Sequence, residues 1–303
     1  MSKAKITVIG AGLMGHGIAQ VFALAGHDVT VYDAAEASLK TVRDRIAANL
    51  RDLDADVTAY ERVRPTGDLA DAVREADYVV EAAPENLALK QKLFAEIETH
   101  VRPDTILASN TSVIPITQIM SGLKRRDRAL GTHWWNPPFL VPLVEVIATE
   151  WTSPATVDFT MKLHAEAGKT PAHVQKDVPG FIGNRLQHAL WREAVSLVER
   201  GICDAETVDT VIKAAFGRRL AVLGPLENAD MVGTDLTLAI HQTVLPDIES
   251  RPGPSPYLEK LVADGKLGFK TGEGFRKWTP EQQAELRGKV VKHLKAALAA
   301  DRE

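Results

Sequence analysis

The chain has almost no cysteine, and this limits how it can be stabilised and what it can bind. Its single cysteine, Cys203, excludes a disulfide within the chain, which is typical of proteins from a reducing cytoplasm. No His/Cys cluster has metal-ligand spacing, so we expect no bound metal. No apolar run reaches transmembrane length, and the first residues lead directly into a strand pattern. We therefore expect a cytoplasmic protein without a signal peptide or membrane span.

An excess of charge of one sign is also absent. The 36 Lys and Arg residues are nearly balanced by 40 Asp and Glu residues, for a net charge of −4. This balance predicts no basic face for nucleic acid. The 303 residues, 45% hydrophobic and 25% charged, allow one or two domains with sizeable cores. The composition is therefore typical of a soluble enzyme, and the reaction has to be inferred from the sequence motifs.

A G-x-G-x-x-G motif follows the first predicted strand, residues 5–9. Gly10 is placed to make a tight turn, Gly12 to let a pyrophosphate approach the backbone, and Gly15 to let helix and strand pack closely. Residues 18–24 then repeat apolar side chains at helical spacing. The start of such a helix offers free N–H groups and a favourable dipole to phosphates. Together these elements predict dinucleotide binding.

The second predicted strand, residues 27–32, ends at Asp33, eighteen residues after Gly15. This spacing is near that of a carboxylate that binds the adenosine ribose diol. The charge of Asp33 should repel a 2′-phosphate, and no arginine is close in sequence, so we expect NAD rather than NADP. We expect Leu13 and Met14, which lie between the glycines, to contact the cofactor as well.

A histidine and a glutamate twelve residues apart, His133 and Glu145, are the leading candidates for catalysis. Residues 139–147 are apolar and β-branched and predict a buried strand, with Pro142 indicating a distortion or an edge. A carboxylate buried there costs on the order of several kcal/mol unless it is paired. Pairing would fix the tautomer of His133 and leave its other nitrogen to move a proton. On this segment alone, a structural histidine and a separately paired glutamate remain the alternative.

Alternating strand and helix patterns continue to about residue 175. They predict an α/β fold with an N-terminal Rossmann domain, a doubly wound parallel sheet, over residues 1–178. A long helix is predicted over 181–200, and helical patterns dominate after it. We therefore expect residues 179–303 to form a smaller, all-helical substrate domain whose apolar helix faces make a homodimer.

Several motifs in this order resemble the 3-hydroxyacyl-CoA dehydrogenase family. The first are the glycine loop, the segment from Glu81 to Lys90, which contains Glu85, and the Ser-Asn-Thr-Ser segment at 109–112, which contains Asn110 and Ser112. They are followed by residues 133–137, Glu145, the Pro-Gly-Phe-Ile-Gly-Asn-Arg segment at 179–185, which contains Asn184, and residues 268–275. Since they cover nearly the whole chain, the resemblance implies an NAD-dependent dehydrogenase with a Rossmann domain and a helical domain.

The resemblance also implies a role for each matching residue. His133 would be the general base that takes the hydroxyl proton while hydride passes to the nicotinamide, and Glu145 would hold it. Ser112 and Asn184 would bind the substrate oxygen. The residues near the cofactor would be Glu85, Lys90, Asn110 and Asn136. For Ser112 a helix N-cap, and for Asn184 an ordinary polar position in a helix, remain the alternatives.

Two departures from the family pattern bear on the substrate. In the acyl-CoA enzymes a long helical hairpin with a basic tip follows the second strand and touches CoA. Here only about thirty residues separate Asp33 from Arg62, and the end of this stretch is acidic, with Asp52, Asp54 and Asp56. Residues 217–225 form a longer loop than the family has. A short, acidic hairpin is a poor partner for the phosphates of CoA. The longer loop, and the Asn-Pro-Pro after His133, resemble relatives that act on free small acids, such as carnitine dehydrogenase, gulonate dehydrogenase (lambda-crystallin) and the dehydrogenase of a pyridine carboxylate.

A free carboxylate is well bound by an arginine, whose planar fork meets both oxygens. Arg219 is the first candidate, ahead of Arg218 and Arg185, and structural ion pairs are the alternative. We therefore favour a dehydrogenase of a secondary alcohol β to the carboxyl group of a free 3-hydroxy acid. The other possibilities are a (S)-3-hydroxyacyl-CoA substrate, an aldehyde hydrate on a pyridine carboxylate, and a non-catalytic, crystallin-like NAD-binding protein.

Overall fold

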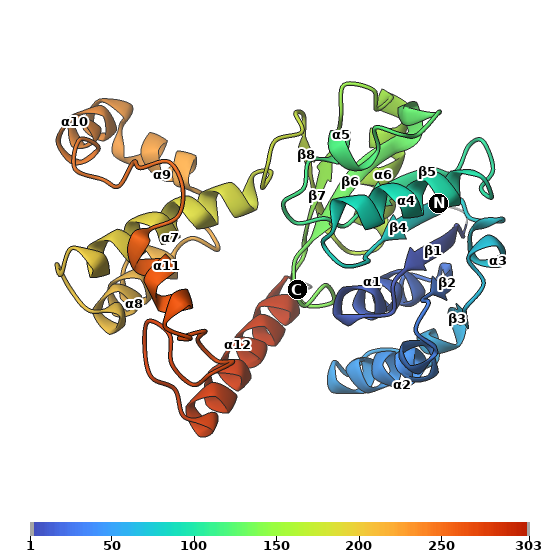
Figure 1. Ribbon diagram of the computed structural model, residues 1–303, viewed down its shortest axis with the longest axis horizontal. Coiled ribbons are helices and arrows are strands. Elements are labelled where there is room, and N and C mark those ends of the chain that lie inside the picture. Colours follow the sequence, from blue (N-terminus) through green and yellow to red (C-terminus); the bar gives the residue numbers. More distant parts are fainter. Residues whose placement is uncertain (1–2, 302–303) are drawn as a thin grey trace. The chain divides into compact units, whose positions relative to one another are not determined.

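The computed structural model describes residues 3–301 (Figure 1). The chain forms two compact units. The first contains the residues up to Arg185 together with those from Val291 on, and the second is Leu186–Val290. Both crossings between the units fall within helices, α7 (Gly183–Glu199) and α12 (Pro280–Ala300). The predicted domain boundary at residue 178 stays a prediction.

An eight-stranded sheet forms the centre of the first unit, in the order β3-β2-β1-β4-β5-β6-β7-β8. Its strands are β1 (Lys5–Ile9), β2 (Asp28–Tyr32), β3 (Val63–Thr66), β4 (Tyr78–Glu81), β5 (Ile106–Ser109), β6 (Ala129–Trp134), β7 (Leu143–Ile147) and β8 (Thr170–Val174). All neighbours are parallel except β6 and β7. The predicted α/β Rossmann class is confirmed, but β7 and β8 run opposite to the other six strands. β7 also begins after Pro142, later than predicted, and the short connection from β6 requires an antiparallel pair.

Helices cover both faces of this sheet (Figure 1). They are α1 (Leu13–Leu24), α2 (Glu36–Asp52), η1 (Val57–Arg62), α3 (Leu69–Val73), α4 (Leu87–Glu98), α5 (Ile116–Ile119), η2 (Arg126–Arg128) and α6 (Pro154–Glu166). Strand residues alternate between two apolar clusters, as the pleat requires. Tyr78 and Val80 pack with α1, α2 and α6, whereas Val79 packs with α3, α4 and α5. Helices therefore cover the sheet on both faces, and its central strands β4, β5 and β6 are buried along their whole length.

Aromatic side chains fill the core on the α1 side of the sheet. Phe22 of α1 lies with its ring 5.6 Å from those of Trp134 and His164 and 6.2 Å from that of Tyr78. His164 is fully buried, and burial lowers its pKa to about 4. The first of the two consecutive tryptophans, Trp134, is therefore a core residue.

The second unit is entirely helical, but it has little core of its own. It contains most of α7, then α8 (Ala205–Ala214), η3 (Phe216–Arg218), α9 (Pro225–Val232), α10 (Thr234–Val244), α11 (Pro256–Ala263) and the first half of α12. Within Leu186–Val290, all of which the structure describes, the buried residues are only Ser196, Val208 and Leu261. None of the helices in residues 3–301 is long and apolar enough to cross a membrane.

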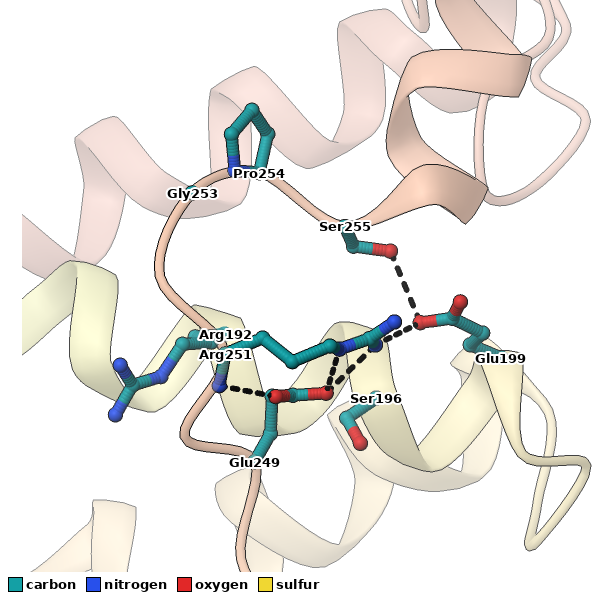
Figure 2. A pocket seen from close by; sticks show the side chains of 8 residues that line it. All are labelled: Arg192, Ser196, Glu199, Glu249, Arg251, Gly253, Pro254 and Ser255. Carbon is teal, nitrogen blue, oxygen red and sulfur yellow. Dashed lines mark hydrogen bonds and ion pairs between the residues drawn. The ribbon is translucent and has the colours of Figure 1, made fainter.

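One loop of this unit, residues 246–255, is tied to α7 by charged groups (Figure 2). Arg251 donates to Glu249 at 2.7 Å and to Glu199 of α7 at 2.8 Å. The hydroxyl of Ser255 donates to the same oxygen of Glu199. These hydrogen bonds from Arg251 lower the pKa of Glu249 to about 2. The loop between α10 and α11 is therefore held by polar contacts rather than by an apolar core.

Candidate active site

The glycine loop after β1 has the geometry that a dinucleotide needs. Gly10 has a φ of 104°, and a Cβ there would lie 2.8 Å from the carbonyl oxygen of Ala82. A Cβ at Gly15 would lie 1.7 Å from the carbonyl oxygen of Gly10. By contrast, a Cβ at Gly12 would have nothing within 4 Å. Gly10 and Gly15 are thus required by the fold itself, while the backbone at Gly12 faces open space that a pyrophosphate can approach.

The N-terminus of α1 adds the polar groups that phosphates require. No side chain caps this helix at Gly12, and its first turn contains no acidic residue. The N–H groups of the first turn, at Leu13 and Met14, lie ahead of any intrahelical acceptor. Asp33, just after β2, accepts hydrogen bonds from the N–H groups of Ala11 and Ala35, at 2.7 and 2.8 Å. Its carboxylate therefore sits beside the glycine loop, and the residues present fit NAD.

Arg45 of α2 also reaches this loop, which the sequence pattern did not indicate. Its guanidinium donates to the carbonyl of Ala11 and lies 3.5 Å from Nδ1 of His16. Arg45 is thirty-four residues from Ala11 in the chain. An arginine can thus be absent from the neighbouring sequence and still lie near the glycine loop in the fold.

His133 and Glu145 are brought together by the register of the antiparallel strands β6 and β7, in which they are direct partners. Nδ1 of His133 lies 2.8 Å from Oε2 of Glu145, and both side chains are buried. Burial raises the pKa of Glu145, but hydrogen bonds from His133 and from backbone N–H groups outweigh it, so its pKa is lowered overall. Because an ionised carboxylate only accepts, Nδ1 carries the proton, and in the neutral imidazole Nε2 is the nitrogen with the lone pair.

The second oxygen of Glu145 meets the start of α7. Oε1 accepts hydrogen bonds from the N–H groups of Ile182 and Gly183, at 2.8 and 3.0 Å. A Cβ at Gly183 would lie only 2.5 Å from the ring of Trp135, which packs 5.4 Å from that of His133. A single carboxylate thus orients the histidine and fixes the first residues of the helix that carries Asn184.

Ser112 and Asn184 are also in contact. Nδ2 of Asn184 donates to the backbone carbonyl of Ser112 at 2.8 Å. The N-cap of the following helix, α5, is Pro115, so Ser112 does not cap it. Asn184 likewise bonds to a distant loop rather than only to its own helix. The structure therefore places both polar side chains at the same end of the sheet as the glycine loop.

Glu85 and Lys90 lie beneath the Ser112 loop. Lys90 of α4 is fully buried, with Nζ 2.6 Å from Glu81 and 3.5 Å from Glu85. Oε1 of Glu85 accepts hydrogen bonds from three consecutive residues, Thr111, Ser112 and Val113. These hydrogen bonds and the charge of Lys90 outweigh burial and lower the pKa of Glu85. The two residues therefore hold the loop between β5 and α5.

Asn110 and Asn136 occupy the ends of two neighbouring strands. Oδ1 of Asn110 accepts a hydrogen bond from the N–H of Trp134 at 2.9 Å, which joins the ends of β5 and β6. Asn136 is exposed and precedes a cis peptide bond to Pro137. Both are at the edge where the glycine loop lies, since β5 and β6 run parallel to β1.

Lys169 supports the loop between β6 and β7, and no sequence motif pointed to it. Its Nζ donates to the carbonyl oxygens of Pro138 and Val141, the latter at 2.9 Å. Burial lowers its pKa to about 8. Because His133 and Glu145 lie on either side of this loop, Lys169 helps to fix the connection between them.

Arg219, the expected carboxylate anchor, follows η3 in the second unit. Its side chain is exposed, as is that of Arg218, and neither forms an ion pair with another described residue. The side chain of Arg185, the third candidate, forms one long hydrogen bond within residues 3–301, 3.5 Å to the carbonyl of Pro179. The assignment of an anchor among the three stays a prediction.

Two family models match the chain one after the other. The NAD-binding domain of 3-hydroxyacyl-CoA dehydrogenase matches residues 5–178, and the C-terminal domain of the same enzyme matches residues 180–278. The chain belongs to the 3-hydroxyacyl-CoA dehydrogenase family. The resemblance in the sequence motifs is thereby confirmed, and so is the expected cofactor, NAD.

Curated members of the family include enzymes of both substrate types. The chain is 39% identical over 296 residues to 5-formyl-3-hydroxy-2-methylpyridine 4-carboxylate 5-dehydrogenase of Mesorhizobium japonicum, covering 96% of each chain. It is 40% identical over 291 residues to the human mitochondrial hydroxyacyl-coenzyme A dehydrogenase, covering 90% of each. This similarity shows an NAD-dependent dehydrogenase that acts on a hydroxyl group of a small molecule.

Solved structures of the family differ in how closely they match. A 5-formyl-3-hydroxy-2-methylpyridine 4-carboxylic acid 5-dehydrogenase, described as an NAD⁺-dependent dismutase, superposes with a TM-score of 0.90 at 38% identity, covering 97% of each chain. The (S)-3-hydroxybutyryl-CoA dehydrogenase of Ralstonia eutropha gives 0.77 at 34% identity, covering 92% of this chain and all of that enzyme. The pyridine-carboxylate enzyme is thus the more similar of these two in backbone as well as in length.

Proposed function

We propose that this dehydrogenase acts on a small substrate that carries a free carboxylate, and that it oxidises a secondary hydroxyl group β to the carboxyl carbon. The observation that carries the proposal is the buried pair of His133 and Glu145, with Nδ1 held at 2.8 Å and Nε2 left to accept a proton. NAD, when bound, accepts the hydride from the carbon. As the hydride leaves, Nε2 of His133 takes the hydroxyl proton, a step for which a positioned base contributes about 10²–10⁴-fold.

Two side chains would act on the substrate oxygen. The hydroxyl of Ser112 and the amide of Asn184 are proposed to donate hydrogen bonds to it as its charge develops. Their contact through the Ser112 carbonyl, at 2.8 Å, supports a shared site. Glu145 would stabilise the imidazolium that forms, because its lowered pKa keeps it ionised.

The cofactor would be held by the glycine loop and the residues around it. We propose that the N–H groups at the start of α1 bind the pyrophosphate and that Asp33 binds the adenosine ribose. The uncapped helix start and the open space at Gly12 support this role. The residues proposed to line the cofactor site are Gly10, Gly12, Leu13, Met14, Gly15, Asp33, Asn110 and Asn136.

A free acid is favoured over a CoA ester by the segment that follows β2. Helix α2 ends at Asp52, and only the short η1 precedes β3, so there is no second long helix here. Asp52 itself is paired with Lys295 of α12, whose Nζ lies 2.6 Å away. An acidic, occupied helix end is a poor partner for the phosphates of CoA. We propose that Arg219 binds the substrate carboxylate instead.

A second candidate reaction is the oxidation of a hydrated aldehyde on a pyridine carboxylate. The TM-score of 0.90 to the enzyme of that class, against 0.77 to a CoA enzyme, favours it. In this reaction the gem-diol carbon loses hydride to NAD, one hydroxyl loses its proton to the base, and a carboxylic acid forms. His133 could therefore serve both reactions without a change of role.

We also propose that the enzyme is a homodimer joined through its helical unit and that it works in the cytoplasm. The exposed apolar side chains of the second unit support the dimer, because a helical unit with so few buried residues needs another surface to cover it. They include Trp191, Leu226, Met231, Leu236, Leu238 and Leu245. We propose a second copy of the chain as the partner, because most oligomers of soluble proteins consist of identical copies.

The test is reduction of NAD, followed by the absorbance of the nicotinamide. The substrates are (S)-3-hydroxybutyryl-CoA, carnitine, gulonate and 5-formyl-3-hydroxy-2-methylpyridine-4-carboxylate, with His133→Ala as the control. We expect turnover of a free carboxylate and little with the CoA ester. Turnover of the CoA ester equal to the best free acid would contradict the proposed substrate class. Arg219→Ala should raise KM for the carboxylate substrate, and an unchanged KM would exclude it as the anchor.

A further inference from the structure

The loop that carries Ser112 is folded around a single carboxylate oxygen. Oε1 of Glu85 accepts hydrogen bonds from the hydroxyl of Thr111 and from the N–H groups of Ser112 and Val113, the last two at 3.1 and 3.3 Å. Successive donors that converge on one point form an anion-binding concavity in the backbone. Because Ser112 and Val113 are themselves exposed, apolar packing does not fix this part of the loop.

The peptide groups of Ser112 are held on both sides. Its N–H donates to Glu85, and its carbonyl oxygen accepts the hydrogen bond from Asn184 at 2.8 Å. With the backbone groups of Ser112 occupied in this way, its hydroxyl is the polar group left for a substrate. The position of that hydroxyl therefore depends on Glu85.

Lys90 holds Glu85 from the buried side. An ammonium group has three N–H donors, and Nζ of Lys90 has three acceptors around it. They are Glu81 at 2.6 Å, the carbonyl of Ala83 at 3.2 Å and Glu85 at 3.5 Å. Lys90 has no exposed surface. Two of its donors are used in hydrogen bonds to Glu81 and Ala83, and it has no accessible face on which to contact a cofactor.

We propose that Glu85 is a positioning residue, which acts on the reaction by fixing the hydroxyl of Ser112, and that Lys90 acts through Glu85. This differs from the cofactor contact expected from the sequence for both residues. The inference rests on the proposed role of Ser112 at the substrate oxygen. Small displacements of a positioned group are costly, since an error of about 1 Å can reduce a rate by about 10²-fold.

The test is the variant Glu85→Gln, which keeps the shape but cannot satisfy both neighbours. An amide presents NH₂ either to the donors of the loop or to the ammonium of Lys90. We expect kcat to fall about 10- to 100-fold, while the Kd for NAD changes less than about threefold. Glu96→Gln, at an exposed position on α4, the helix that follows Glu85, is the control and should leave both values unchanged.

A double-mutant cycle with Ser112→Ala then separates the possible causes. If Glu85 acts through Ser112, adding Glu85→Gln to Ser112→Ala should cost little more. In the absence of NAD, hydrogen exchange of the amides of residues 112 and 113 should also be faster in Glu85→Gln. A large rise in the Kd for NAD with kcat unchanged, or additive losses in the cycle, would overturn the inference. If Ser112→Ala is fully active, the proposed role of Ser112 fails, and the positioning role of Glu85 fails with it.

Discussion

The two units of this enzyme reach their stability in different ways. In the first, the strands β4, β5 and β6 are buried along their whole length, and helices cover both faces of the sheet. In the second, long amphipathic helices leave most of their apolar side chains exposed. The comparison teaches that the pair of His133 and Glu145 is placed by strands of a core complete in itself, whereas the helical unit has very few buried side chains of its own.

Truncating a buried side chain of the first unit should lower the free energy of unfolding more than any other change proposed here. Truncating an apolar side chain of the second unit should have a much smaller effect. Phe22 is fully buried among Tyr78, Trp134 and His164. Phe22→Ala is expected to lower the free energy of unfolding by about 3–5 kcal/mol, measured by urea denaturation. Ile202→Ala, in the turn after α7 and at a side chain that is 56% exposed, is the control in the second unit and should cost far less. Equal losses from the two variants would remove the contrast between the units.

The buried histidine of the same core should make stability depend on pH. The pKa of His164 is lowered by burial to about 4, from its usual 6.5. The neutral His164 therefore makes its full contribution to the free energy of unfolding above about pH 6.5. This contribution, up to about 3 kcal/mol, is lost as the pH falls towards 4. Urea denaturation at several pH values should show a weaker acid dependence in His164→Phe. His16 and His27, whose pKa values burial also lowers, titrate in both proteins, as do carboxylates with a lowered pKa such as Glu145, and all of these contribute to the remaining slope.

A charge on the exposed apolar surface of α10 should test what covers the second unit. Leu238→Glu is expected to raise the dissociation constant of the dimer about 100-fold, or about 2.7 kcal/mol, measured by sedimentation equilibrium. Gln242→Glu adds the same charge to the same helix but removes no apolar side chain, so it should raise the dissociation constant of the dimer much less. A wild-type enzyme that is monomeric at all concentrations would refute the proposed dimer.

The smallest effect is expected where polar contacts replace a core. Arg251→Met removes one of the two side-chain donors, with Ser255, that link residues 246–255 to Glu199, so this loop should exchange its amide hydrogens faster with little change in Tm. Arg192→Met is a suitable control, because Arg192 lines the same pocket and forms none of the contacts drawn there (Figure 2). Equal exchange in the two variants would show that the loop is held by something else. In the wild type, the ionised Glu249 should make its full contribution to the stability of this loop above about pH 4.5, and this contribution should be lost as the pH falls towards 2.

The sequence was most informative where chemistry depends on neighbours in the chain. The spacing of Gly10, Gly12 and Gly15 predicted the first β-α-β segment, and a glutamate in an apolar strand pointed to its partner, His133. The reversal of β7 and β8 was missed, because the strand patterns do not show direction. Arg45 was missed for another reason: it meets the glycine loop only after α2 has packed beside α1.

The same reason limited what could be predicted about Glu85. Its position in the motif indicated a place near the cofactor, but not the three donors of residues 111–113, which lie at least twenty-six residues away in the chain. Lys169 belongs to no sequence motif, and its contact with Pro138 joins residues thirty-one positions apart. Residues that support a site through such long-range contacts become visible only in the folded structure.

The two oxygens of Glu145 limit how this enzyme can be redesigned. One oxygen sets the tautomer of His133, and the other accepts hydrogen bonds from the N–H groups of Ile182 and Gly183, where α7 begins. A substitution at Glu145 intended to tune the basicity of the histidine would also shift the helix that carries Asn184. New substrate preferences are therefore better sought by varying residues that neither oxygen of Glu145 touches.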